Sequence, residues 1–135
     1  MNKWEDDSWF LKALPEIQAV QKILEDRLSD NPTELYGQLC TVEAWHGRMT
    51  SLLADANARL DGAEYQALIA LPEGVKGSAR DITVANIVKK ERRLRDILDG
   101  LCTTIKNRLI LGESLRRQSN AERGNFTQQG TDFNG

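Results

Sequence analysis

The chain has 135 residues and a net charge of −2, with 40% hydrophobic, 28% charged and only 6% aromatic residues. This length suits one domain, and the shortage of aromatic residues favours helices, because strands prefer aromatic and β-branched side chains. No apolar run approaches the roughly 18 residues of a membrane span, and the opening MNKWEDDSWF lacks the basic-then-apolar order of a signal peptide. We therefore expect no membrane partner and a cytoplasmic location, in the host cytoplasm if the protein is viral.

The first expected helix covers residues 8–28, where apolar residues recur at helical spacing. Its stripe consists of Leu14, Ile17, Val20, Leu24 and Leu28. Pro15 lies inside this range and can start the regular helix, because the first turn does not need the N–H that proline lacks. The sequence SDNPT at residues 29–33 then breaks the pattern and offers Thr33 as a helix cap.

A second, long helix is expected over residues 33–71. Its apolar seam has spacings that alternate between four and three residues, the heptad pattern of helices that pack side by side. The seam residues are Leu35, Leu39, Val42, His46, Met49, Leu53, Ala56, Leu60, Ala63, Ala67 and Ala70. The alanines predict a close approach of the partner helix.

The sequence PEGVKGSA at residues 72–79 predicts a turn, and Ser78 with Asp81 resembles a capping pair for a third helix over residues 79–122. The seam of this helix includes Val84, Ile87, Leu94, Leu98, Leu101 and Ile105. A short turn between two long helices predicts that they fold back antiparallel. The expected fold is therefore all-α: a long antiparallel helical hairpin, coiled-coil-like, with an N-terminal helix.

We expect residues 1–123 to form a single helical domain. A two-helix hairpin buries little surface, so the N-terminal helix, other copies of the chain, or both must cover the rest. The aromatic side chains of Trp4, Trp9 and Phe10 could dock there. Residues 124–135 lack periodicity and predict a flexible C-terminal tail, which carries Phe126 and Phe133.

The sequence gives little support for catalysis or for a cofactor. His46 is the single histidine and lies on the heptad seam, where a polar residue more often sets register, and no metal-ligand spacing surrounds it. Cys40 and Cys102 belong to no C-x-x-C pair, should not meet within one hairpin, and are expected to be small buried residues of a reduced cytosolic protein. The stretch GVKGS at residues 74–78 lacks the phosphate-loop pattern.

Charge is distributed unevenly, because residues 1–75 are acidic overall and residues 76–123 are basic. The stretch KKERRLRD at residues 89–96 begins the basic part. Arg95, Lys106 and Arg117 follow one another at 11-residue intervals, about three helical turns, so they fall in a row on one face. The row is flanked by Lys89, Arg92, Arg93 and Arg116. Such a row suits a phosphate backbone; alternatively, the interleaved acidic residues make it an ordinary solvated helix face.

The order of elements, the size and two short stretches resemble the UvsY-type phage recombination mediators. The family's DNA-binding signature L-K-A-R-L-D-Y is similar to ANARLDG at residues 56–62, with Asn57 at the position of the lysine and Gly62 at that of the tyrosine. The stretch TTIKNRLILGESLRR at residues 103–117 is similar to the family's oligomer-forming helix. The resemblance implies a helical homo-oligomer that binds single-stranded DNA, with Arg59 as a DNA contact. Its implied partners are a RecA-like recombinase and a single-strand binding protein.

Taken together, the sequence favours a non-enzymatic, oligomeric accessory protein that helps to load a recombinase onto single-stranded DNA. The DNA-binding residues would be Arg59, Lys89, Arg92, Arg93, Arg95, Lys106 and Arg117, and the oligomer contacts Leu109, Ile110, Leu111 and Leu115. One alternative is a structural or assembly coiled coil of a phage virion, in which the charges pair between subunits. Another is a small phage inhibitor of a host defence factor.

Overall fold

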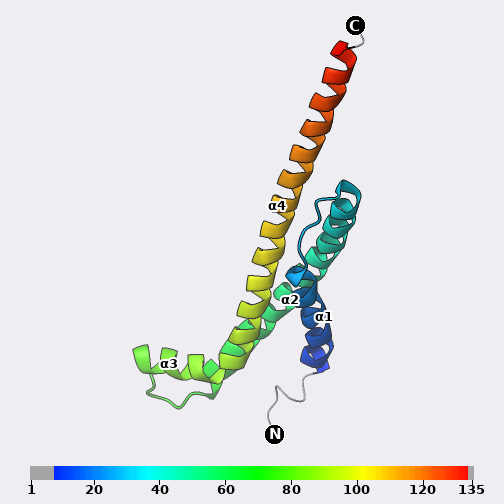
Figure 1. Ribbon diagram of the computed structural model, residues 1–135. Coiled ribbons are helices and arrows are strands. Elements are labelled where there is room, and N and C mark those ends of the chain that lie inside the picture. The colour runs from blue at the N-terminus through cyan, green and yellow to red at the C-terminus, as the bar shows by residue number, and fades with distance from the viewer. Residues whose placement is uncertain (1–7, 134–135) are drawn as a thin grey trace.

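The computed structural model describes residues 8–133, with side chains described for residues 8–122. These residues form four helices and no strand (Figure 1): α1 (Ser8–Glu25), α2 (Pro32–Ala70), α3 (Gly77–Ile87) and α4 (Lys89–Phe133). The expected all-α class is confirmed. None of the helices in this part of the chain combines the length and the apolar character that a membrane crossing requires.

The start of α2 is fixed by a side chain that directly precedes it. The Asn31 side chain accepts hydrogen bonds from the backbone N–H groups of Thr33 and Glu34, at 2.9 and 3.2 Å, so Asn31 rather than Thr33 is the cap. Pro32 then occupies the first turn, where its missing N–H costs nothing. Pro15, by contrast, lies within α1, which already begins at Ser8.

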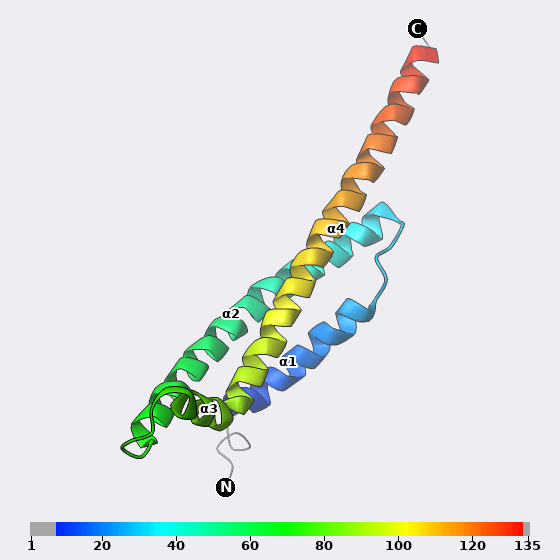
Figure 2. The same ribbon diagram turned by 90° about the vertical axis from the view of Figure 1, so that its left-hand side faces the viewer.

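The core lies where α2, α4 and α1 meet. Both views show α2 and α4 side by side, with α1 against them (Figures 1 and 2). The predicted seam of α2 is mostly buried, although His46, Leu53 and Ala63 are half-buried and Ala70 is exposed. Sequence reasoning missed one core position on this helix, because Leu52 is also buried, at 2% exposure. The fully buried centre combines Met49, Val20, Leu98 and Ile105.

The predicted third helix is in fact two helices, because the chain bends at Val88. This residue has φ −97° and ψ 15°, outside the helical range, and α3 is turned sharply away from α4 (Figure 1). Val88 is completely buried in a second apolar cluster with Leu60, Ala67 and Val84. The bend therefore lets α3 cover the C-terminal part of α2, and it leaves Ile87, predicted on the seam, 54% exposed.

The turn between α2 and α3 uses the glycines that its sequence offers. Gly74 and Gly77 have φ values of +94° and +61°, in the left-handed region that glycine adopts without steric cost. The predicted capping pair is wrong, because α3 begins at Gly77 and places Ser78 and Asp81 inside the helix, with Lys76 at the cap position and no side-chain cap bond.

The C-terminal segment differs from the expected end at residue 122, since α4 continues to Phe133 beyond the start of α2 (Figure 2). The mobility of the segment stays a prediction. Trp4, residues 134–135 and the side chains of Phe126 and Phe133 lie outside the described residues. Trp9 and Phe10 do pack against the main core, as expected of the N-terminal aromatic residues.

Candidate nucleic-acid interface

The six predicted DNA-binding residues of α4 divide into a row along one flank and a cluster at the bend. We call the row the basic track; it comprises Arg92, Arg95, Lys106 and Arg117. The cluster consists of Lys89 and Arg93, which with Arg92 line a shallow open hollow where α3 meets α4. Arg92 and Arg95 are half-buried, whereas the other four side chains are exposed. The structure thus places all six predicted α4 cations on accessible surface.

Few of these cations are engaged in ion pairs. The Arg92 guanidinium lies 3.5 Å from a carboxylate oxygen of Glu64 on α2, and Arg95 lies 2.8 Å from its neighbour Asp96. Within the described residues, no ion pair is found for Lys89, Arg93, Lys106 or Arg117. Exposed pairs contribute little stability, so a phosphate can compete with the two that exist.

The track lies on the flank of α4 that faces away from α1. Arg108 marks the α1 flank, because its guanidinium donates a hydrogen bond to the carbonyl oxygen of Leu24 in the last turn of α1. Lys106 is two residues from Arg108, and positions two apart on an α-helix point to nearly opposite sides. The Arg92–Glu64 contact puts the track beside the flank of α2 that α1 leaves open. Among the described helices, none covers the basic track on the flank of α4 that faces away from α1.

Arg59 is not part of this surface. Its guanidinium lies over the ring of Trp9, 4.5 Å from the ring centroid, which places Arg59 on the α1 side of α2. Arg59 therefore lies apart from the α4 row, and its role as a DNA contact stays a prediction. Asn57, at the signature's lysine position, is exposed and lies two turns before Glu64, hence on the flank that borders the track.

Acidic residues interrupt the track. Asp96 and Asp99 are exposed between Arg95 and Lys106, and Glu113 lies 3.6 Å from Arg116. The flank therefore carries both acidic and basic side chains, with the basic ones in excess. A DNA strand bound there would contact cations that are separated by carboxylates.

The predicted oligomer contacts are not equally available. Leu109 packs against the main core, whereas Ile110, Leu111 and Leu115 are exposed by 62%, 54% and 37%. Three of the four residues are thus free to meet another surface, and Leu109 instead stabilises the fold.

The single histidine and the two cysteines belong to no metal-ligand cluster in the described part of the chain. His46 is half-buried, and no group of three or more metal-ligand side chains occurs in the described part of the chain. Both cysteines are free. The sequence predicts that Cys40 is buried, but it is exposed. Burial raises the pKa of the Cys102 thiol, and the hydrogen bond with Thr50 opposes this rise only in part.

Sequence reasoning missed the polar contacts that position the helices. Arg48 of α2 binds Glu16 of α1 through two hydrogen bonds, at 2.7 and 2.8 Å, and Arg108 satisfies a C-terminal carbonyl of α1. Arg116 of α4 lies over Tyr36 of α2, with 5.1 Å between the guanidinium carbon and the ring centroid. Each contact joins residues far apart in the sequence, so local spacing carries no signal for it.

No family model matches the chain, and no curated protein or solved structure is significantly similar to it. The resemblance to the UvsY-type mediators therefore rests on the order of elements, the size and the short stretches at residues 56–62 and 103–117.

Proposed function

We propose that the protein is a non-enzymatic, oligomeric accessory protein that binds single-stranded DNA along the basic track. The observation that carries this proposal is the row of accessible cations on one long helix, of which Lys106 and Arg117 have no ion pair within the described residues. Electrostatic contacts to phosphates are independent of base sequence and release counterions, so they give binding that weakens steeply with salt.

The mechanism is multivalent. A single track with so few cations binds weakly, but an oligomer presents several tracks to one strand and raises the effective concentration of each. Ile110, Leu111 and Leu115 supply apolar surface for such an assembly, and α2 and α4 would act as a coiled-coil-like antiparallel hairpin that holds the tracks rigidly. The resemblance to recombination mediators then suggests that a RecA-like recombinase and a single-strand binding protein are partners in the cytoplasm.

The test is the affinity of the purified full-length chain for a fluorescent single-stranded oligonucleotide, measured by anisotropy over a range of salt concentrations. We expect the logarithm of the affinity to fall linearly with the logarithm of salt, by about 0.7 units for each phosphate contact. Lys106→Gln and Arg117→Gln should each flatten the slope by roughly one contact and should weaken binding to all sequences alike. Lys22→Gln, an exposed lysine on α1, is the matched control and should change neither quantity.

A structural role predicts different results. The Arg92–Glu64 contact favours this second candidate, because it pairs one cation of α4 with the acidic half of the chain. If the cations serve only such pairs, Arg92→Gln lowers stability or assembly, and no oligonucleotide binds even at low salt. That absence of binding in the wild-type protein would contradict the proposed function.

A further inference from the structure

We propose that Tyr36 and Arg116 form a stacking platform for an unpaired nucleobase at the C-terminal end of the basic track. This inference rests on the proposed single-stranded DNA binding and deepens it, because it assigns to one site the contact with the base rather than with the phosphate.

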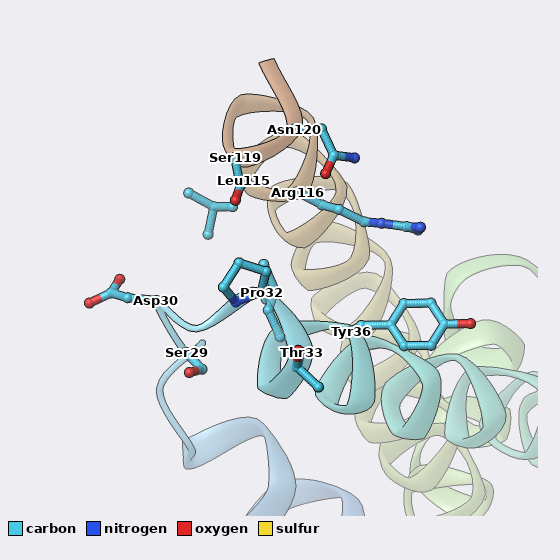
Figure 3. A pocket seen from close by; sticks show the side chains of 10 residues that line it. Ser29, Asp30, Pro32, Thr33, Tyr36, Leu115, Arg116, Ser119 and Asn120 are labelled. Carbon is cyan, nitrogen blue, oxygen red and sulfur yellow. The ribbon is translucent and has the colours of Figure 1, made fainter. Parts of the chain in front are cut away.

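The platform lies where the first turns of α2 approach α4. Tyr36 lies one turn after the Asn31 cap, and Arg116 precedes Arg117 of the track. Figure 3 shows the two side chains reaching out on the same side, whereas Leu115 points to the other side of α4. The guanidinium of Arg116 lies over the phenol ring, and Tyr36 is nevertheless 54% exposed. An aromatic ring is thus held on the surface by a cation.

An exposed ring fixed in this way has the properties of a base-stacking site. Proteins that bind single strands combine cations that follow the backbone with aromatic side chains on which bases stack. Packing of Arg116 over Tyr36 orders the ring before a base arrives, which lowers the entropic cost of stacking. Arg116 also keeps its positive charge next to the ring, and its pairing with Glu113 at 3.6 Å is too exposed to prevent contact with a phosphate.

The hollow beside the platform favours a neutral, hydrogen-bonding group. It has a volume of about 350 Å³, and its lining includes Ser29, Thr33, Ser119 and Asn120. Asp30 and Arg116 also line the hollow, and their opposite charges offset each other there. The exposed Arg117, which has no ion pair within the described residues, is therefore the contact for the phosphate, and Tyr36 is the contact for the base.

Tyr65 provides an internal comparison. It lies on the same helix and is 62% exposed, yet no cation lies over its ring among the described residues. Its neighbour Glu64 is already paired with Arg92. If exposure of a tyrosine were enough for base stacking, both residues would contribute; the platform requires Tyr36 alone.

The experiment compares two oligonucleotides of equal length and charge, oligo(dT) and a strand with abasic sites, with the full-length protein at low salt. Base stacking on an aromatic residue contributes enough to give roughly a 5- to 100-fold preference for oligo(dT) in the wild-type protein. Tyr36→Leu should abolish this preference without changing the salt slope, whereas Tyr36→Phe and Tyr65→Leu should retain it. Thermal melting should be nearly the same for all variants, because both side chains are largely exposed.

The outcomes separate this inference from the proposed function. Binding to neither strand contradicts the proposed function and the platform together. Equal binding of both strands by the wild-type protein leaves the function intact and overturns the platform, whatever the variants do. A preference for oligo(dT) that survives in Tyr36→Leu also overturns it, since the base is then recognised elsewhere.

Discussion

At the scale of single residues, Gly112 allows α4 to lie close to α2. A Cβ atom at this position would come within 2.1 Å of Cδ2 of Leu39, which is itself buried at 5% exposure. Gly112→Ala should therefore destabilise the fold by about 1–3 kcal/mol, because Leu39 must shift within a packed core. Urea denaturation followed by circular dichroism measures the change.

Gly100→Ala is the matched control for Gly112→Ala. Gly100 lies in the same helix, and a Cβ atom there meets nothing within 4 Å. Alanine at this exposed helical position should stabilise the protein by about 0.5–1 kcal/mol, because it restricts the unfolded chain and favours helix. Equal effects of the two substitutions would show that Gly112 is not a point of close approach.

The Glu16–Arg48 ion pair gives the stability a specific dependence on pH. The hydrogen bonds from Arg48 hold the pKa of the Glu16 carboxyl below its ordinary value, and burial opposes this only in part. A lowered folded-state pKa means that the contribution is fully present above the ordinary carboxyl pKa and is lost as pH falls through the folded-state value. The pair is well exposed, so the contribution should be at most about 1 kcal/mol.

A comparison of Glu16→Gln with the wild-type protein checks this dependence. The variant should be less stable at pH 7, and the difference should disappear in acid as the wild-type Glu16 becomes protonated. Glu43→Gln is the control, because Glu43 is exposed on α2 and has no ion pair in the described part of the chain. A difference that persists unchanged to the lowest pH would mean that Glu16 acts through packing instead of charge.

At the scale of elements, periodicity predicted the helices better than it predicted where they bend. The turn at Gly74 and Gly77 and the burial of most of the α2 seam followed from local patterns. The bend at Val88 did not, because no proline or glycine marks it and the seam residues continue through it. It depends on burial of Val88 against α2, which is a tertiary contact that the local sequence does not encode.

The candidate site was predictable to a similar degree. The 11-residue spacing identified the α4 row, because helical geometry alone places those residues on one face. The same reasoning could not show that Arg59 faces Trp9 of α1, because this contact joins two residues that are far apart in the sequence. It also could not find the Tyr36–Arg116 contact, which joins the first turns of one helix to a distant part of another.

The bend itself can be tested through the anchoring of α3. Val88→Ala removes buried apolar atoms from the cluster that holds α3 against Leu60 and Ala67. We expect amide hydrogen exchange to become faster in α3 while α2 and α4 near the main core keep their protection, because local openings have their own free energies. Ile87→Ala is the control, since Ile87 is 54% exposed, and it should leave exchange in α3 nearly unchanged. Uniformly faster exchange in Val88→Ala would instead show that the bend unfolds with the whole protein.

At the scale of the whole molecule, the exposed apolar residues of α4 predict self-association. Leu111 and Leu115 lie one turn apart on the same face, 54% and 37% exposed. A charge at either position should lower the apparent mass in sedimentation at micromolar concentration, because an unpaired charge cannot be buried in an apolar interface. Leu111→Glu and Leu115→Glu are compared with Ser114→Glu, which adds the same charge at an exposed polar position. A compact monomer in the wild-type protein would remove the oligomer from the proposed function.

The position of the track within the folded molecule leads to the last prediction. Asn57 is exposed on the flank of α2 that borders the track, two turns before Glu64, which contacts Arg92. Asn57→Lys should therefore extend the track across both helices, strengthen binding of single-stranded DNA and steepen the salt slope by about one contact. Ser51→Lys adds the same charge on the outer side of α2, because Ser51 is exposed and lies two residues after the buried Met49. It should change binding much less. If the two lysines strengthen binding equally, the strand responds to net charge alone, and the flank between α2 and α4 is not where it lies.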